Sequence, residues 1–380
     1  MNKVKIAIVG CGSTMMYMYG HVFKYLDNAV LAAVMDVDEA RAKLAQSRYG
    51  AAVVYADYDR MLADDEIEAV IIATPVFLHH EHVLKAAAAG KHVLCEKPLA
   101  RTIDECDQMI AACSQNNVLL MTGFMKRFNE NFRIAKQLVD AGRLGEIIQV
   151  RAQWDLPAPE MDELHWRYAL PAWGGIYLDH GAHVIDLCCW WAGDVETVSA
   201  EIGVLRPKSE TDDQAVVTLR HINGAVSHHH MTCMWHKDTL EVYEIYGTKA
   251  TLELKLYGAI SCMTTEPFAI RLYENGGRTI TDLSPYYQGT GDDDSDPTFG
   301  PTCLDVYDKT RDTSQYLKEL SYFCDCVQNQ QMPDITGIEG RRAIEIVNAA
   351  FLTSWQGKKI KLPLSESPDL ERIFTEIKRR

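Results

Sequence analysis

The sequence has no long hydrophobic run and no excess of positive charge. None of its apolar stretches approaches the roughly 18 residues that a transmembrane helix needs. Its 38 Lys and Arg residues stand against 53 Asp and Glu residues, which gives a formal net charge of −15. Because like charges repel, this surplus argues against a nucleic-acid backbone or an anionic membrane surface. We therefore expect no nucleic-acid partner and no membrane partner.

The sequence also lacks a zinc-type cysteine pattern and a leader segment. Its eleven cysteines include no C-x-x-C pair, and the pairs Cys188-Cys189 and Cys324-x-Cys326 do not have the usual zinc spacing. A strand-like run begins within three residues of Met1, which leaves no room for a basic, apolar and cleavable leader. We expect a cytoplasmic protein with buried thiols and no metal site.

The first 123 residues alternate between apolar runs of strand length and stretches of helical length. Runs that are apolar on both faces and separated by helices are typical of a parallel sheet covered on both sides. The sequence therefore predicts an α/β domain of the Rossmann type over residues 1–123. The predicted strands are Val4–Val9, Val30–Met35, Ala52–Tyr55, Ala69–Ala73, Val93–Cys95 and Val118–Thr122, and the predicted helices are Asp38–Arg48, His79–Ala89 and Ile103–Gln115.

Residues 124–363 show a different pattern, with longer runs in which apolar and polar residues alternate. Such runs predict a second, α+β domain with a large, mostly antiparallel, open-faced sheet. Residues 364–380 are expected to form a C-terminal tail. The predicted strands are Ile148–Trp154, Val195–Val204, Ala215–His221, Ala225–Cys233, Leu240–Tyr246 and Ala250–Leu256, with helices at Phe132–Ala141, Leu178–Trp191, Thr313–Gln328 and Ile338–Gln356.

The first predicted strand runs into a glycine-containing loop that suits a dinucleotide. Gly10 allows a tight turn, and Gly12 lets backbone amides approach a pyrophosphate at a helix N-terminus. Ser13 and Thr14 complete the loop. Met15 stands where the fingerprint has Gly or Ala, which leaves the closeness of helix–strand packing open.

Asp36 ends the second predicted strand, 24 residues after Gly12. An acid there accepts hydrogen bonds from the adenosine ribose and repels a 2′-phosphate, which favours NAD over NADP. Asp38 adds negative charge, or else serves as a helix N-cap.

Four further segments carry a family resemblance. They are residues 69–100 with the triplet Glu96-Lys97-Pro98, the triplet Lys126-Arg127-Phe128, residues 174–187 with an Asp-x-x-x-His pattern, and residues 339–363. Together with the glycine loop, they resemble the glucose–fructose oxidoreductase/inositol dehydrogenase/MocA (Gfo/Idh/MocA) family over residues 4–363. The resemblance implies an NAD-dependent oxidoreductase with a Rossmann domain and an open-faced sheet domain, and a cis bond before Pro98.

The resemblance also implies three catalytic residues. Lys97 would donate to the substrate oxygen, where an ammonium stabilises developing alkoxide charge. His183 would accept the hydroxyl proton, because imidazole titrates near neutral pH. Asp179, four residues earlier on the expected helix, would bind a hydroxyl or support that proton transfer.

Further residues would border the cofactor if the resemblance holds. Glu96 would approach the nicotinamide ribose, and Arg127 would lie near the nicotinamide or the substrate. Thr74, Pro75 and His79 belong to the loop that follows the fourth strand, although His79 could equally support the loop from behind or lie at the surface.

Two groups of residues are not explained by the family motifs. Aromatic and histidine side chains precede the catalytic helix, and they suit either a sugar ring or a protein interface; they are Trp154, His165, Trp166, Tyr168 and Trp173. His180 stands beside the expected catalytic pair. The strand period of two puts His228 and His230 on one face and His229 on the other. We leave open whether His228 and His230 bind substrate hydroxyls, an interface or, with His165 or His180, a divalent metal.

These observations favour an NAD(H)-dependent dehydrogenase acting on a secondary alcohol of a sugar, glycoside or cyclitol. The aromatic residues favour a pyranoside, oxidised at C3. One alternative is a redox-neutral glycosidase that works by oxidation, elimination, hydration and reduction. Another is a non-catalytic NAD sensor, which the presence of Lys97 and His183 disfavours. Alternating apolar residues in Leu240–Tyr246 also predict a homodimer or homotetramer formed through the sheet domain.

Overall fold

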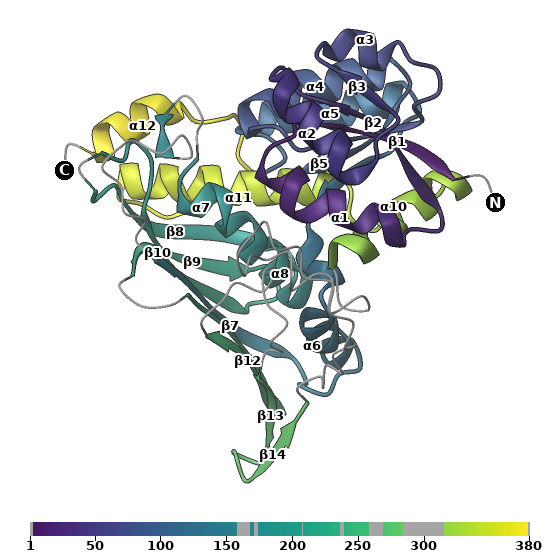
Figure 1. Ribbon diagram of the computed structural model, residues 1–380. Helices are drawn as coiled ribbons and strands as arrows, with labels where there is room; N and C mark the ends of the chain where they lie inside the picture. The colour runs from purple at the N-terminus through teal and green to yellow at the C-terminus, as the bar shows by residue number, and fades with distance from the viewer. Residues whose placement is uncertain are drawn as a thin grey trace. The chain divides into compact units, whose positions relative to one another are not determined.

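The computed structural model describes residues 3–157, 168–170, 174–206, 208–235, 239–257, 269–283 and 315–378. The chain divides into two compact units (Figure 1). The first comprises Met1–Phe128 and Ser314–Arg342, and the second comprises Asn129–Thr313 and Ala343–Arg380. Among the described residues, no helix is long and apolar enough to cross a membrane. The nine cysteines in the described ranges are all free and buried, as expected.

The first unit contains the predicted parallel sheet, with strand order β3-β2-β1-β4-β5-β6. Every residue of β4 is buried, as is typical of a strand covered on both faces. This confirms the Rossmann-type fold. The strands are β1 (Val4–Val9), β2 (Ala29–Met35), β3 (Val53–Tyr55), β4 (Ala69–Ile72), β5 (His92–Glu96) and β6 (Leu120–Gly123), and the helices between them are α2 (Glu39–Tyr49), α3 (Tyr58–Leu62), α4 (Val76–Ala88) and α5 (Ile103–Gln115).

Capping side chains fix where several of these helices begin. Asp38 accepts hydrogen bonds from the amides of Ala40 and Arg41 and thereby starts α2. Asp38 therefore serves as a helix N-cap, and the argument for NAD over NADP depends on Asp36. Thr102 caps α5 in the same way, through the amide of Glu105.

The segment after the glycine loop is not a regular α-helix. It begins with the π-helical turn η1 (Met15–Tyr19) and continues as α1 (Gly20–Val22) and the 3₁₀ turn η2 (Phe23–Tyr25). Met15 is fully buried in the wide turn. The position in this segment that requires a glycine for close packing is Gly20, where an added Cβ would lie 2.4 Å from the ring of Tyr49.

The boundaries of the units differ from those predicted, because the chain returns to the first unit near its end. Helix α10 (Gln315–Asn329) packs beside β1, and its Asp325 accepts a hydrogen bond of 2.7 Å from Asn28 Nδ2. Thr122 Oγ1 donates to the carbonyl of Thr336, at 2.9 Å. Helix α11 (Gly337–Gln356) begins in this unit and ends in the second.

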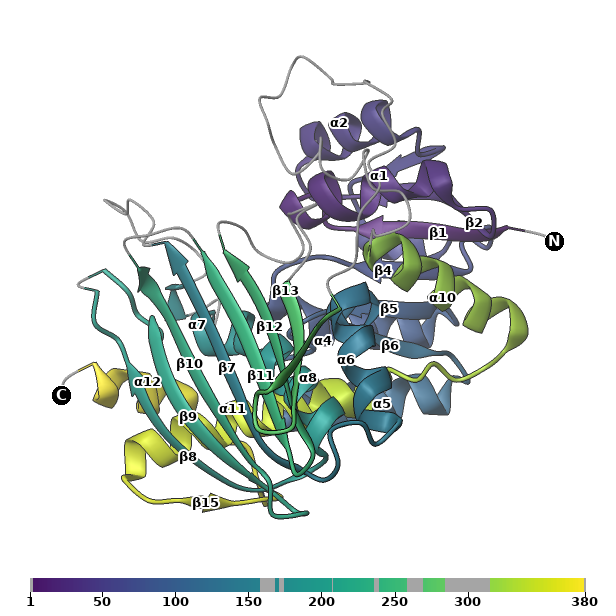
Figure 2. The ribbon, with the colours of Figure 1, turned by 90° about the horizontal axis from the view of Figure 1, so that it is seen from below.

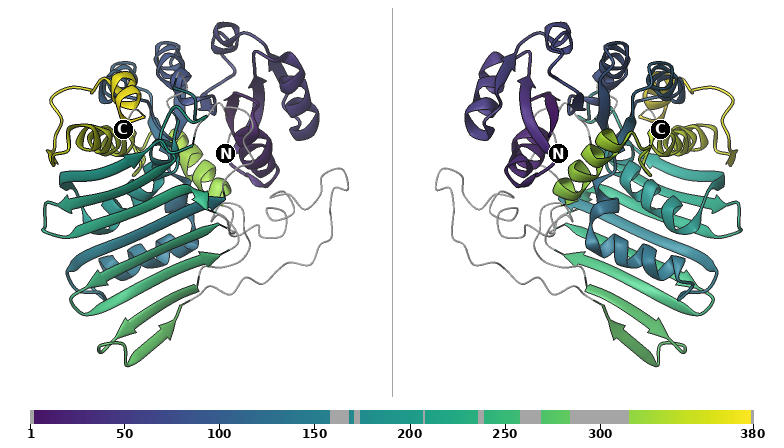
Figure 3. Two further views of the ribbon diagram at one scale, coloured as in Figure 1. Left: turned by 90° about the vertical axis from the view of Figure 1, so that its left-hand side faces the viewer. Right: turned by 90° about the vertical axis from the view of Figure 1, so that its right-hand side faces the viewer.

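The second unit is built on a nine-stranded sheet with the order β14-β13-β12-β11-β7-β10-β9-β8-β15 (Figure 2). Among the described pairings, all are antiparallel except β7 with β10, which confirms the mostly antiparallel sheet. In Figure 3 the strands lie side by side as one continuous sheet. They are β7 (Ile147–Pro157), β8 (Val195–Gly203), β9 (Gln214–His221), β10 (Val226–Trp235), β11 (Leu240–Gly247), β12 (Ala250–Tyr257), β13 (Ala269–Glu274), β14 (Thr279–Asp282) and β15 (Ile360–Lys361).

Among the described elements of this unit, helices cover one face of the sheet and none covers the other, which we call the open face (Figure 2). The unit's helices include α6 (Glu130–Asp140), α7 (Ile176–Asp179) and α8 (Gly181–Ala192). Trp154, His229 and Tyr243 point to the covered face and are buried.

The open face is more polar than the sequence suggested. Arg151 pairs with Glu244 at 3.2 Å, and His230 pairs with Asp155 at 3.2 Å. The buried residues of the alternating pattern in β11, such as Tyr243, lie on the helix-covered side. The half-exposed Leu240 and Val242 and the exposed Val216 share this face with the ion pairs, and self-association through it stays a prediction.

The expected tail is a helix that packs onto the second unit. Helix α12 (Leu370–Ile377) buries Leu370, Ile373, Phe374 and Ile377, a spacing that places them on one face. The ring of Phe374 lies 4.8 Å from that of Phe351, and Lys378 Nζ donates to the carbonyl of Ser209 at 2.6 Å.

His229 is part of the buried core on the helix-covered face of the sheet. The residue is 1% exposed, its Nδ1 lies 3.0 Å from the hydroxyl of Tyr177, and burial lowers its pKa to about 3. His229→Ala leaves a cavity and a buried hydroxyl without its partner, so it should destabilise the protein by roughly 1–3 kcal/mol. Urea unfolding followed by circular dichroism measures this, with the exposed His228→Ala as control. Equal unfolding midpoints for the two variants would contradict it.

Candidate active site

The glycine loop of the first unit is held in place by Asp36. The carboxylate accepts the amide of Cys11 at 2.8 Å and the amide of Asp38 at 2.9 Å. These bonds join the loop after β1 to the end of β2. Each carboxylate oxygen can accept a further hydrogen bond, so the half-buried Asp36 can still bind a ribose hydroxyl.

The two loop glycines have different reasons to lack a side chain. Gly10 has φ +95°, and a Cβ there would lie 2.9 Å from the carbonyl oxygen of Ala73. Gly12 has open space where its Cβ would stand. That space, next to the exposed Ser13 and the half-buried Thr14, leaves the backbone open to a pyrophosphate group. The residues present therefore fit a bound dinucleotide.

His79 links the next two loops of the same sheet edge. Its Nε2 lies 2.8 Å from the carbonyl oxygen of Thr74, and its Nδ1 lies 2.9 Å from that of Pro98. The side chain is 1% exposed, and burial lowers its pKa. Because both ring nitrogens lie beside protein carbonyls, the geometry matches the alternative in which His79 supports the loop from behind, and a direct cofactor contact stays a prediction. Thr74 and Pro75 remain half-exposed at the start of α4.

The triplet Glu96-Lys97-Pro98 follows β5 at this edge. Glu96 is buried, and its Oε2 accepts the amide of Lys97 at 3.0 Å. The bond between Lys97 and Pro98 is cis, and the Lys97 side chain is half-buried. Arg127, in the 3₁₀ turn η3 (Met125–Phe128), is half-buried as well.

A second cluster lies in the other unit, where α7 meets α8. Asp179 is the last residue of α7, and its Oδ2 lies 3.7 Å from Nδ1 of His180. His183, in the first turn of α8, is 2% exposed. The predicted single helix is thus two helices, with the break at His180.

Trp154 supports this cluster from β7. Its ring centroid lies 5.0 Å from that of His180 and 6.3 Å from that of His183. Trp154 is 2% exposed, as is His183, and it packs against the histidines. Stacking of Trp154 on a sugar ring stays a prediction.

The other predicted substrate residues are not in this cluster. His228 and His230 are exposed on the open face of the sheet, opposite the helices, so the strand period was right but a role beside His183 was wrong. His165, Trp166 and Trp173 lie outside the described residues. Within the described ranges, no group of three or more His, Cys, Asp or Glu residues could hold a metal ion.

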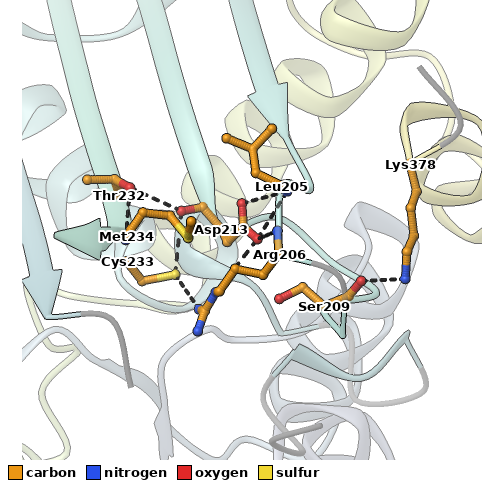
Figure 4. Close-up of polar contacts among 8 residues, drawn as sticks. All are labelled: Leu205, Arg206, Ser209, Asp213, Thr232, Cys233, Met234 and Lys378. Atoms are coloured by element: carbon orange, nitrogen blue, oxygen red, sulfur yellow. Dashed lines mark hydrogen bonds and ion pairs between the residues drawn. The ribbon is translucent and has the colours of Figure 1, made fainter. Parts of the chain in front are cut away.

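The loop before β9 contributes residues that sequence reasoning missed (Figure 4). Asp213 is fully buried and accepts the amides of Leu205 and Arg206, at 2.9 and 2.8 Å. The Arg206 guanidinium lies 3.7 Å from Asp213 and 2.7 Å from the sulfur of Cys233. These contacts anchor the loop.

The anchored loop presents Asp212 to the start of α7. Asp212 Oδ2 accepts the amide of Tyr177 at 2.6 Å, and its backbone carbonyl accepts that of Ile176 at 3.0 Å. Gly175 has φ +92°, and a Cβ there would lie 2.0 Å from Asp212 Oδ1. Asp212 thus caps the helix that carries Asp179, and burial raises its pKa to about 8. The adjacent Thr211-Asp212-Asp213 is visible in the sequence, but its partner, 35 residues away, is not.

Comparisons with known proteins agree with this arrangement. Residues 4–124 match the family model described as "Oxidoreductase family, NAD-binding Rossmann fold", and residues 132–253 match the "GFO/IDH/MocA C-terminal domain". The myo-inositol 2-dehydrogenase of Thermotoga maritima is 28% identical, over 94% of this chain and 98% of its own. The 2,7-anhydro-N-acetylneuraminate hydratase of Mediterraneibacter gnavus is 26% identical, over 95% and 97%. The aldose-aldose oxidoreductase of Caulobacter crescentus shares the fold, with a TM-score of 0.80, 24% identity and coverage of 95% and 100%.

Asp36 should make the protein select NAD over NADP. A 2′-phosphate would meet a carboxylate already fixed by two amides, so NAD should bind at least about tenfold more tightly, equivalent to about 1.4 kcal/mol. Asp36→Asn keeps the shape of the side chain and should reduce the difference between the affinities for NAD and NADP. Titration of each cofactor against tryptophan fluorescence measures it, and equal affinities for the wild type would refute the role given to Asp36.

Asp212 should make stability fall with rising pH. Its pKa is about 8 when folded, above the ordinary value of 3.8, so its contribution is complete below about pH 4 and is lost towards pH 8. Asp212→Asn keeps an acceptor for the amide of Tyr177 and does not titrate. The unfolding free energy of the wild type should therefore decline relative to the variant, by up to roughly 1.4 kcal/mol per pH unit.

Urea unfolding of both proteins between pH 5 and about 9 provides the measurement. Glu201→Gln, at an exposed position in β8, serves as the control for loss of a carboxylate. Parallel pH profiles for the wild type and Asp212→Asn would show that Asp212 is ionised throughout.

Proposed function

Since the chain belongs to the Gfo/Idh/MocA family of NAD-binding oxidoreductases, we propose that it oxidises or reduces a secondary alcohol of a sugar, glycoside or cyclitol. The observation that carries this proposal is the cluster in which His180 and His183 pack against Trp154 and Asp179 lies beside His180. Carboxylate and imidazole groups side by side can bind vicinal hydroxyls and accept a proton. Inositol and aldose enzymes among the relatives support a polyhydroxylated ring as substrate.

In this proposal the residues of the chain divide the work. When bound, NAD supplies the hydride acceptor or donor. His183 takes the proton of the reacting hydroxyl, and its burial keeps bulk water from competing for that proton. Asp179 holds a substrate hydroxyl or supports the imidazolium that forms. Lys97 donates to the reacting oxygen, where negative charge develops.

A redox-neutral reaction is the second candidate. One relative that spans nearly the whole chain is a hydratase of an anhydro sugar acid, which indicates that this architecture also serves reactions without net oxidation. His180, 3.7 Å from Asp179, would supply an additional acid or base for elimination and hydration.

A substrate panel separates the two candidates. Sugars, inositols and aryl glycosides, including pyranosides open to oxidation at C3, are incubated with NAD while NADH absorbance and free aglycone are followed together. NADH without aglycone supports the dehydrogenase. Aglycone released with no net NADH supports the redox-neutral glycosidase. A complete lack of both products over the whole panel would argue against a carbohydrate substrate.

His183→Ala should reduce kcat by about 10²–10⁴ while leaving NAD affinity nearly unchanged, because a general base acts mainly in the transition state. Lys97→Ala should lower kcat similarly, with some loss of substrate affinity. His228→Ala, on the open face of the sheet, is the matched histidine control and should keep its activity. If His183→Ala retains more than about a tenth of the wild-type kcat, another group, such as His180, is the base.

A further inference from the structure

Two buried carboxyl groups of the first unit meet at a single tyrosine. Tyr19, in the π-helical turn after the glycine loop, is fully buried, and its hydroxyl lies 3.0 Å from Oε2 of Glu319 in α10. The same hydroxyl hydrogen-bonds Glu96, at the end of β5. The ring of Tyr316 packs edge-on against Tyr19, with 5.2 Å between centroids. Segments about 220 residues apart in the sequence thus converge beside the triplet of residues 96–98.

The single proton of the Tyr19 hydroxyl cannot form hydrogen bonds to two ionised carboxylates at once. A phenol carries one proton, so Tyr19 can donate to one carboxyl and must accept from the other. Glu319 is fully buried, its Oε1 has no hydrogen-bond partner, and none of the ion pairs in the described part of the chain involves it. A charge at Glu319 would therefore be buried and uncompensated, which is costly.

Glu96 is the better place for the negative charge. Its carboxylate already accepts the amide of Lys97 at 3.0 Å, at the end of β5. Burial, followed by the charge of Glu96, raises the pKa of Glu319 well above its usual range. Burial also raises the pKa of Tyr19, so the phenol keeps its proton.

We propose that Glu319 is a protonated positioning residue of the NAD site: it donates its proton to Tyr19, so that the Tyr19 hydroxyl donates to Glu96 and holds that carboxylate in one orientation. The link to NAD rests on the proposed function, because it takes Glu96 as the residue next to the nicotinamide ribose. The arrangement explains how the buried Glu319 is accommodated although no ion pair within the described ranges involves it. Its three members are Glu319, Tyr19 and Glu96.

Infrared spectroscopy of the cofactor-free protein tests the protonation. The difference spectrum between wild type and Glu319→Gln near pH 7 should contain the carbonyl band of a protonated carboxyl, and Tyr19→Phe should shift that band. Carboxylate bands alone would overturn the proposal. Because no substrate or NAD is needed, this result is independent of whether an alcohol is oxidised.

NAD titration by tryptophan fluorescence tests the positioning. Glu319→Gln keeps a neutral donor and should bind NAD within about threefold of wild type, whereas Glu319→Leu and Tyr19→Phe should bind about tenfold more weakly. Tyr58→Phe is the matched control, since Tyr58 is a buried tyrosine of the same unit whose hydroxyl donates to the carbonyl of His82 at 2.7 Å. Equal NAD affinities for Tyr19→Phe and Tyr58→Phe would overturn the positioning role.

If Glu319→Gln does not fold, the infrared comparison of wild type with Tyr19→Phe still decides the protonation. A protonated carboxyl band that shifts on loss of the phenol supports the proposal, and an unchanged spectrum in that region refutes it.

Discussion

The candidate cofactor site depends on one constraint: loops at the end of a fully buried sheet have to be fixed by side chains. The central strand β4 is buried along its whole length, so the chain leaves the sheet there with polar backbone groups that need partners. Asp36 accepts a hydrogen bond from an amide of the loop after β1, and His79 lies between carbonyls of the loops after β4 and β5. The candidate ligand-binding side chains are therefore few. Their loops are held in place by hydrogen bonds within the protein.

The same constraint takes another form in the second unit, where one face of a large sheet is buried under helices. The start of α7 leaves the amides of Ile176 and Tyr177 inside the protein, and Asp212 supplies their acceptors. Asp212 in turn depends on a loop held by Asp213 and Arg206. The orientation of Asp179 and His183 thus rests on a loop that contains no candidate catalytic residue.

Sequence periodicity predicted the strands and the parallel sheet, because burial on one or two faces leaves a direct trace in the pattern of apolar residues. Period two also placed His228 and His229 on opposite faces, but it cannot tell which face the helices cover, so it left open whether His228 lies near His183. The return of α10 to the first unit and the contact of Tyr177 with Asp212 depend on tertiary packing. Local motifs carry no signal for pairings of that kind.

The charge of the cofactor gives a reason for keeping Glu319 neutral. A dinucleotide brings a negatively charged pyrophosphate to a chain whose own net charge is −15. Asp36 is half-exposed, so water screens its charge. Glu96 and Glu319 are both buried, and two carboxylates bridged by one phenol would repel each other and the cofactor with little screening. Protonating the deeper acid leaves a single negative charge, at Glu96, and converts the second carboxyl from a source of repulsion into a hydrogen-bond donor.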